Sequence, residues 1–300
     1  MPDIPGLTVI DCKDKPEWLK ERDNFVVTGS GGNEMISRPL TFYARKKGLL
    51  PPIEQTERMR WGLRFQRAIG FGFGEDTGRE VEEAPPYSIF VCPDAPFIGA
   101  TLDFFEKDPE KGEGILETKN VSAEWIEEIP IAYQIQVQIQ LACVPIKKYG
   151  TVAGVQAGNK LQWADIDRHA EFMKRFISKA EEMQWRLSTN NPPPVDDDGS
   201  EDTAKALSAL YPSDRGTQIA LPPEALEWTR EVEALKAQSK VMEEEIRARE
   251  NALKAAIGDA TMGVLADGSG WSWKSQRRVD PPRLEERVTE FRVLRRLKGK

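Results

Sequence analysis

The sequence predicts an α/β protein whose core is followed by a long helix and a β-hairpin. Apolar runs typical of strands occupy residues 97–105, 115–121 and 148–157, and the apolar spacing of helices occupies residues 57–71 and 165–187. Strands and helices that alternate along a chain are typical of a sheet covered by helices. With 300 residues, 39% of them hydrophobic, the chain is long enough for one large core and an appendage.

The first two strands carry residues with acid–base character. A polar turn separates the strand 97–105 from the strand 115–121. Side chains alternate across a strand and rise roughly 3.3 Å per residue, so Glu117 and Lys119 point to the same side, about 6.6 Å apart. If the two strands pair, Asp103, near the end of the first, reaches Glu117 on its neighbour.

Two carboxylates that converge beside a lysine are unfavourable unless a cation lies between them. Oxygen ligands favour Mg²⁺, with Mn²⁺ as a substitute, so Asp103 and Glu117 are the candidate metal ligands. Lys119 would then orient a water molecule. The alternative is a surface hairpin with scattered charges, because Asp followed by Glu-X-Lys is a short pattern.

Histidine and cysteine usage excludes several other kinds of site. His169 is the only histidine, and it lies in the predicted helix 165–187, far in sequence from the carboxylates. The three cysteines are scattered singly, without CxxC spacing. These counts argue against a Ser-His-Asp triad, a zinc site, an iron–sulfur cluster and a disulfide framework. Hydrolytic chemistry would therefore have to rely on carboxylates, a lysine and a metal.

Charge and hydropathy limit where the protein is expected to act and which partners it is expected to have. The chain contains no run of 18 apolar residues, and its N-terminus has neither a basic start nor an apolar signal core, so we expect a cytoplasmic protein with no membrane partner. The formal net charge is −7, whereas residues 271–300 hold ten Lys or Arg against four Asp or Glu. A basic end on an acidic chain suggests contact with DNA, and a solubilising terminus is the alternative.

Two further segments are candidates for the site. The turn 29–32 reads Gly-Ser-Gly-Gly, and the backbone N–H groups of such a turn suit a phosphate. The run 133–141 alternates Gln with apolar residues, a pattern that favours a half-buried strand. Read as a helix, the same run places Tyr133, Gln136 and Gln140 on one face.

The chain divides by composition into three parts. Residues 1–187 form the predicted core, residues 188–221 are rich in Pro, Asp and Gly and are interpreted as a linker, and residues 222–300 form the appendage. Apolar residues at three-four spacing predict one long helix that ends at Gly258. A hairpin is predicted over residues 262–274, and we expect this appendage to pack on the core or on a neighbouring subunit.

Three motifs in order resemble the YqaJ and lambda-exonuclease family of viral recombination nucleases, within the PD-(D/E)XK superfamily. Small residues at 99–101 precede Asp103, Glu117-Thr118-Lys119 follows, and Tyr133 then precedes Gln136-Val137-Gln138. The resemblance spans roughly residues 15–185. It implies a restriction-endonuclease-like core, with a central mixed sheet flanked by helices, and a helix rather than a strand over 133–141.

The resemblance also implies roles for the central residues. Asp103, Glu117 and the Thr118 carbonyl would hold Mg²⁺, and Lys119, aided by Gln136, would position the attacking water. The family has a glutamate on the helix 57–71 that helps to hold a metal, and this chain has Gln66 at the matching position.

Other residues are implied in nucleic-acid binding. Ser30 and Arg22 match a family pair that grips a DNA phosphate, although their spacing is one residue longer here. Tyr133 would face the site, and Arg64 on the helix 57–71 would border the DNA or be solvated.

The implied activity is digestion of linear double-stranded DNA from a 5′ end, which leaves single strands for an annealing protein. Relatives form trimeric rings around DNA, so a homo-oligomer is expected. Two alternatives stay open: a structure-selective or restriction-like endonuclease, and a DNA-binding recombination module whose nuclease site is weakened, which Gln66 would suggest.

Overall fold

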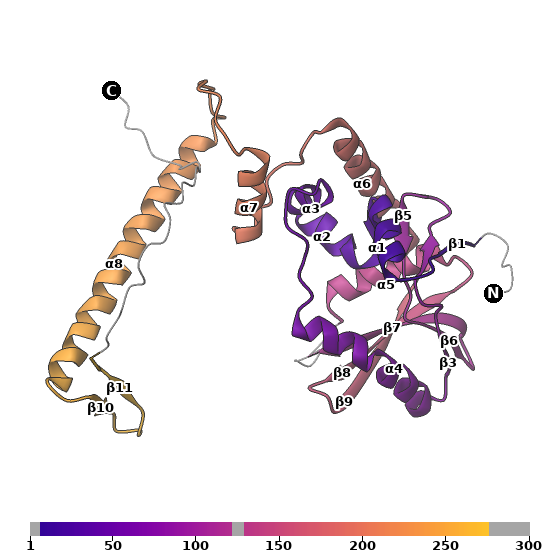
Figure 1. The fold of residues 1–300 in the computed structure, drawn as a ribbon, viewed down its shortest axis with the longest axis horizontal. Coiled ribbons are helices and arrows are strands. Elements are labelled where there is room, and N and C mark those ends of the chain that lie inside the picture. The colour runs from indigo at the N-terminus through magenta and orange to yellow at the C-terminus, as the bar shows by residue number, and fades with distance from the viewer. Residues whose placement is uncertain (1–6, 122–128, 276–300) are drawn as a thin grey trace. The chain divides into compact units, whose positions relative to one another are not determined.

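The computed structural model describes residues 7–121 and 129–275, and it divides the chain into two compact units (Figure 1). The first unit comprises residues 1–212 and the second comprises residues 213–300. The candidate site residues all belong to the first unit.

A five-stranded sheet forms the centre of the first unit. Its strands, in spatial order, are β3 (Glu80–Glu83), β6 (Phe104–Asp108), β7 (Gly112–Val121), β8 (Tyr149–Gln156) and β9 (Lys160–Asp167). β7 and β8 run parallel and the other neighbours run antiparallel, so the sheet is mixed. Because helices cover this sheet, the predicted α/β core is confirmed.

A second sheet corrects the prediction of one strand over residues 97–105. It has the order β1 (Thr8–Asp11), β4 (Ser88–Val91), β5 (Ile98–Ala100) and β2 (Val27–Thr28). The chain leaves this sheet after β5 and enters the five-stranded sheet at β6. Asp103 therefore lies in the bend between two strands of different sheets, immediately before β6.

The helices of the first unit are α1 (Lys15–Asn24), α2 (Gly32–Ser37), α3 (Pro39–Lys46), α4 (Glu57–Thr77), α5 (Ile131–Cys143), α6 (Ala170–Thr189) and α7 (Glu201–Leu210), with the 3₁₀ turn η1 (Gly29–Gly31). α4 packs on one face of the five-stranded sheet, where Ile69 and Phe73 contact Leu116. α5 packs on the other face, where Val137 and Leu141 contact Ile115.

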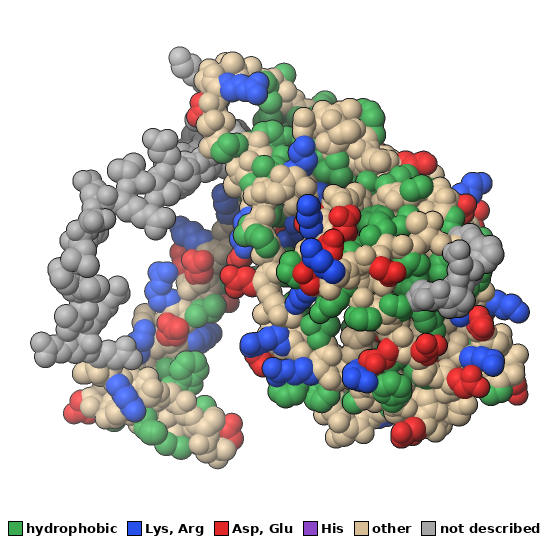
Figure 2. All heavy atoms as spheres, turned by 45° about the vertical axis from the view of Figure 1, so that its right-hand side comes forward, with side chains coloured by type: hydrophobic (Ala, Val, Ile, Leu, Met, Phe, Trp, Pro, Cys, Tyr) green, Lys and Arg blue, Asp and Glu red, His purple; other side chains and the backbone are tan. Residues whose placement is uncertain are grey.

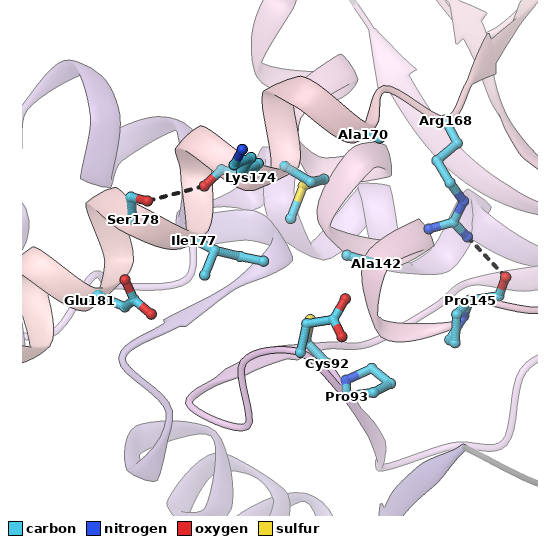
Figure 3. A pocket seen from close by; sticks show the side chains of 12 residues that line it. Cys92, Pro93, Ala142, Pro145, Arg168, Ala170, Lys174, Ile177, Ser178 and Glu181 are labelled. Atoms are coloured by element: carbon cyan, nitrogen blue, oxygen red, sulfur yellow. Dashed lines mark hydrogen bonds between the residues drawn. The ribbon is translucent and has the colours of Figure 1, made fainter.

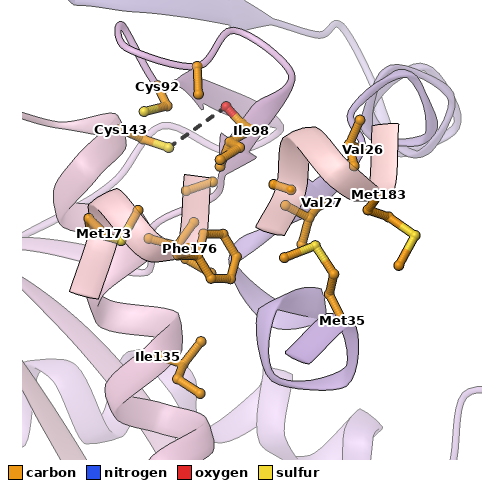
Figure 4. Close-up of a cluster of buried hydrophobic side chains, with 14 of the residues drawn as sticks. Val26, Val27, Met35, Cys92, Ile98, Ile135, Cys143, Met173, Phe176 and Met183 are labelled. Carbon is orange, nitrogen blue, oxygen red and sulfur yellow. Dashed lines mark hydrogen bonds between the residues drawn. The ribbon is translucent and has the colours of Figure 1, made fainter. Parts of the chain in front are cut away.

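Residues 133–141 are helical, against their strand-like alternation and in agreement with the family resemblance. The alternation arises because α5 is buried on two sides. Val137 and Leu141 face the sheet, whereas Ile135 and Ile139 face a second core built with α2 and α6 (Figure 4). A helix between two cores buries residues at i and i+2, and this mimics the period of a strand.

The predicted start of the helix 165–187 is wrong. Asp165 and Ile166 belong to β9, a strand that the sequence reading missed, and α6 begins only at Ala170. His169 is the residue before the helix, and its Nδ1 accepts a hydrogen bond from the Phe172 N–H. His169 is thus a helix cap, which satisfies a backbone donor of the first turn.

The segment interpreted as a linker is folded in its first part, and the division between the two units falls within it. α7 packs against α3. Buried Asp196 accepts hydrogen bonds from Leu40 N (2.8 Å), Thr41 N (2.9 Å) and Thr41 Oγ1 (2.7 Å). These are orphan donors of the first turn of α3, so a residue about 155 positions away caps this helix.

The second unit contains α8 (Ala225–Ile257) and the hairpin of β10 (Met262–Val264) and β11 (Gly270–Ser272). Gly258 ends α8 with a positive φ of 60°, so the predicted helix end and the predicted hairpin are confirmed. Most of the basic C-terminal segment, from residue 276 onwards, lies outside the described residues. No helix in the described ranges is both long and apolar enough to cross a membrane.

A buried ionic network lies on β6, β8 and β9. The Arg79 guanidinium donates to Asp165 at 2.8 and 2.9 Å and to Glu106 at 3.1 Å, and it forms an ion pair with Asp108 at 2.7 Å. Thr151 also donates to Glu106 and Asp165. Burial raises the pKa of Glu106 to about 7, although hydrogen bonds from Thr151 and Arg79 oppose this shift.

The tertiary cap of α3 yields a stability prediction. Asp196→Ala should lower the free energy of unfolding by about 2–4 kcal/mol, because it leaves the buried N–H groups of Leu40 and Thr41 without an acceptor. The exposed neighbour Asp197 provides the control, and Asp197→Ala should change stability by less than about 0.5 kcal/mol. Urea denaturation of both variants measures the difference, and equal effects would show that the cap contributes nothing.

The buried Glu106 predicts how stability depends on pH. The raised pKa means that the folded protein keeps a proton that the unfolded chain releases, so this carboxyl makes stability fall as pH rises from about 4.5 to 7. Glu106→Gln should remove this loss, which is on the order of 2–3 kcal/mol. Urea unfolding between pH 5 and 8 in EDTA tests it against the exposed control Glu110→Gln, which should keep the wild-type slope.

Candidate active site

The candidate site forms where β7 extends beyond its neighbour β6. β6 pairs with β7 only as far as Leu116, so the next residues of β7 have no strand on that side. Asp103 fills this position: its Oδ2 accepts the Thr118 N–H at 2.9 Å and the Thr118 hydroxyl at 2.7 Å. The N–H and C=O of one strand residue point to the same side, so the Thr118 carbonyl points to the same edge.

Glu117 is buried and is held by three side-chain donors. Its Oε1 accepts from Lys119 Nζ (2.6 Å) and Gln136 Nε2 (2.8 Å), and its Oε2 accepts from Gln140 Nε2 (2.6 Å). Both glutamines belong to α5, which packs on the face of the sheet to which Glu117 points. The carboxylate is therefore fixed in orientation, while a carboxylate with about four lone-pair directions can still accept one more partner.

Lys119 lies between Glu117 and α5. Its Nζ donates to Gln136 Oε1 at 2.9 Å and lies 4.9 Å from the centre of the Tyr133 ring. Burial alone lowers the pKa of Lys119, but the Glu117 and Asp103 carboxylates outweigh burial and raise it. The ammonium is therefore charged at neutral pH, and its position is set by groups on both β7 and α5.

The electrostatics at Asp103 favour a cation. Burial and the nearby Glu117 raise the pKa of Asp103, and the hydrogen bonds from Thr118 only partly oppose this. Both described hydrogen bonds to Asp103 end on Oδ2. Oδ1, Glu117 and the Thr118 carbonyl thus supply oxygen donors for a hard cation, and the excess negative charge gives a reason to bind one.

The donor set limits how such a cation would be held. Among the described residues, no group of three or more His, Cys, Asp or Glu side chains is arranged to hold a metal. Two carboxylates and one carbonyl leave further positions for water and substrate, as Mg²⁺ usually requires. The residues therefore fit a site for a divalent cation whose coordination water and substrate complete, rather than a closed structural site.

Arg22 and Ser30 are also brought together. Arg22 Nη2 donates to Ser30 Oγ at 3.0 Å and to Thr28 Oγ1 at 3.2 Å, and the guanidinium lies 4.4 Å from the Trp18 ring centre. The turn η1 that carries Ser30 contacts α5. A Cβ added to Gly29 would lie 3.6 Å from Gln136 Cγ, so this turn approaches the glutamine face of α5 closely.

Gln66 and Arg64 lie apart from this cluster. Gln66 is half-buried on α4, which covers the face of the sheet opposite to that of Glu117 and Lys119. None of the hydrogen bonds described at the site involves it. Arg64 is exposed on the same helix, with its guanidinium 4.8 Å from the centre of the Trp61 ring.

Gln140 is the site residue that the sequence reading did not select. It is 1% exposed and donates to the Thr101 carbonyl at 3.0 Å as well as to Glu117, while its Oε1 has no hydrogen-bond partner in the described structure. The signal was available, because Gln140 is one helical turn beyond Gln136. Gln138 faces elsewhere and bonds the backbone of Asp167 and His169.

A separate cavity lies away from this site. It encloses about 710 Å³ between α6 and the turn that follows β4 (Figure 3). Met173 and Ile177 of α6 line it together with Pro93, and Arg168 closes one end by donating to the Pro145 carbonyl. None of the carboxylates of the candidate site lines it.

Charged side chains on the face that Figure 2 draws do not separate by sign. Acidic and basic side chains are interspersed on this face. With a net charge of −7, any grip on a phosphate must come from local groups such as Arg22 and Lys119 rather than from the overall field.

Solved structures similar to the chain include an alkaline exonuclease, LHK-Exo, from Laribacter hongkongensis. It is 15% identical and covers 59% of this chain and 94% of its own, with a TM-score of 0.45 alone and 0.47 in complex with dAMP. A phage related exonuclease from Haemophilus somnus 129PT is 16% identical and covers 60% of this chain and 91% of its own, with a TM-score of 0.38. No curated protein matches the chain.

The family comparison covers the segment that builds the site. Residues 17–154 match the model of the YqaJ-like viral recombinase domain. This range begins within α1 and ends in β8, and it contains Asp103, Glu117, Lys119 and both glutamines. The segment that builds the candidate site is therefore similar to the YqaJ-like viral recombinase domain.

Proposed function

We propose that this protein is a metal-dependent exonuclease that digests linear double-stranded DNA. The observation that carries the proposal is the meeting of Asp103, Glu117 and Lys119 at an open sheet edge, inside a viral recombinase domain. A recombinase domain acts on DNA, and two carboxylates beside a charged lysine are suited to phosphodiester hydrolysis.

Each residue has a proposed role. Asp103, Glu117 and the Thr118 carbonyl would hold Mg²⁺, with Mn²⁺ as a substitute, and the cation would supply positive charge to the phosphodiester and acidify water. Lys119 would orient the attacking water, because its Nζ is already fixed by Glu117 and Gln136. Gln140 would hold the second oxygen of Glu117 and so keep the carboxylate aimed at the edge.

Arg22 and Ser30 would bind a phosphate of the digested strand. Their side chains converge within 3.0 Å on a turn that contacts the same helix as the catalytic cluster. A guanidinium with nearby hydroxyl donors suits a phosphate, and Tyr133 beside Lys119 would contact the DNA. We propose that the bound phosphate is the 5′ one, which gives digestion in the 5′ to 3′ direction.

The proposals on partner, assembly and location rest on the resemblance to the family rather than on contacts in this structure. The spared strand would pass to a single-strand annealing protein, and the exonuclease would work as a homo-oligomer, such as a trimeric ring around the DNA. We propose that the protein acts on DNA in the cytoplasm, which is the host cytoplasm if a phage encodes it.

Cleavage of linear but not circular duplex is the test. Purified protein with Mg²⁺ should digest a linear duplex to completion and leave a closed circle intact, and strands labelled at the 5′ or 3′ end report the direction. Glu117→Gln should lower the rate by at least about 10³-fold while DNA binding persists, because the variant keeps the shape and loses the charge. Cutting of the circle would instead indicate an endonuclease, and binding without cleavage would indicate a weakened module.

Lys119 should affect catalysis without affecting metal affinity. Lys119→Met should lower the rate by about 10²-fold or more, because the ammonium positions water but is not a ligand. Isothermal titration with Mg²⁺ or Mn²⁺ should give a dissociation constant within about threefold of the wild-type value. Lys147 provides the control, because its Nζ forms an ion pair with Glu113 at 2.9 Å and takes no part in the site. Lys147→Met should keep full activity. A collapse of metal affinity in Lys119→Met would show that the lysine is structural.

A further inference from the structure

The first half of α4 carries aromatic and arginine side chains that the proposed chemistry does not use. The fully buried residues of this helix are Ile69, Gly70 and Phe73, all in its second half. In the first half, Trp61 is 42% exposed and Phe65 is 38% exposed. Single exposed aromatic side chains are common on protein surfaces, but exposed rings that lie against each other can mark a binding surface.

These side chains are arranged as a stack. The Trp61 and Phe65 rings lie 5.3 Å apart at an angle of 29°, and the Arg64 guanidinium lies 4.8 Å from the Trp61 ring centre. The three planar groups are thus already ordered against each other. A planar ligand could extend this stack without a new loss of side-chain freedom.

The charge of this helical segment is positive. Residues 57–67 contain Arg58, Arg60, Arg64 and Arg67 against the single acid Glu57. Within the described ranges, Arg60 pairs with Glu57 and Arg67 pairs with Glu83, whereas no ion pair is described for Arg58 or Arg64. Exposed rings interleaved with arginines match the chemistry of single-stranded nucleic acid, which offers bases for stacking and phosphates for cations.

The helix that carries the stack also contacts the residue next to Asp103. Gly70 allows α4 to approach the sheet so closely that a Cβ there would lie 2.4 Å from the Phe104 ring. Phe104 directly follows Asp103 in the chain. Phe65 and Trp61 are five and nine residues before Gly70, or roughly 8 and 14 Å along the helix axis.

We propose that the Trp61–Arg64–Phe65 stack binds single-stranded DNA by stacking on its bases. This inference rests on the proposed function, because a nuclease that removes one strand of a duplex leaves the other unpaired beside its site. Arg58 and Arg64 contact the phosphates, and the rings contact the bases without selecting a sequence. The stack therefore holds an unpaired strand close to the edge where its complement is cut.

Fluorescence anisotropy with labelled oligothymidylate and with a labelled hairpin duplex tests this surface. Full-length protein in EDTA is used, so that metal-dependent cleavage does not consume the probes. Trp61→Ala should weaken binding of oligothymidylate roughly tenfold or more and change duplex binding by less than about twofold. Trp61→Phe, which keeps a ring, should restore most of the lost affinity, and Arg64→Gln should reduce the salt dependence of binding.

Trp185 on α6 provides a matched control, because it is 52% exposed and has the Arg186 guanidinium 5.9 Å from its ring centre. Trp185→Ala should bind oligothymidylate as the wild type does. Equal losses in Trp61→Ala and Trp185→Ala, or no loss in either, would overturn the proposal. So would a change of sedimentation coefficient in Trp61→Ala with unchanged DNA binding, which would assign the stack to self-association.

The same preparations separate this proposal from the nuclease itself. If the wild type does not digest linear duplex in Mg²⁺ but Trp61→Ala loses binding of oligothymidylate, the single-strand binding role of the stack is supported and the proposed nuclease activity is overturned. If the wild type digests linear duplex and Trp61→Ala binds oligothymidylate as the wild type does, the binding role of the stack is overturned and the proposed nuclease activity is supported.

Discussion

The structure of the site depends on one buried carboxylate, that of Glu117, and on the three donors that hold it. Lys119 comes from the same strand, whereas Gln136 and Gln140 come from α5 on the covering layer. A buried charge of this kind is stabilised by its hydrogen-bond donors, and both oxygens of Glu117 have a donor from α5. The packing of α5 on the sheet therefore also fixes the positions of Glu117 and Lys119, so a substitution that moves α5 should also disturb these two side chains.

The position of α5 between two cores gives this arrangement its rigidity. Its apolar residues face the five-stranded sheet on one side and α2 and α6 on the other, so only the glutamine face remains for polar contacts. The η1 turn packs closely on that face at Gly29, which brings Ser30 and Arg22 to the same helix. A single helix thus connects the carboxylates, the lysine and the candidate phosphate ligands, and its own stability comes from burial rather than from those contacts.

Local patterns predicted the parts of the site that lie within one strand and failed where the chain changes direction. Glu117 and Lys119 share a face because strand side chains alternate, and this required no tertiary knowledge. Asp103 was placed at the end of a strand because residues 97–105 are almost uniformly apolar, yet the chain changes sheets inside that run. The helical state of α5 and the role of Gln140 depend on burial from two sides. A single sequence carries no measure of such burial, and only the family resemblance favoured the helix.

The two ends of the five-stranded sheet handle buried charge in different ways, and the contrast bears on function. At the network around Arg79, burial alone would raise the pKa of Asp165, but hydrogen bonds from Arg79 and Lys111 outweigh burial and lower it. In the same network burial raises the pKa of Glu106 to about 7, although Thr151 and Arg79 donate hydrogen bonds to it. At the open edge, Asp103 has a raised pKa beside Glu117, with Thr118 as its described hydrogen-bond partner and one oxygen left over. The same sheet thus shows that this fold can neutralise buried acids with its own side chains. The Asp103 carboxylate keeps one oxygen without a described hydrogen bond, beside the negative charge of Glu117, and this is what a site for an exchangeable cation requires.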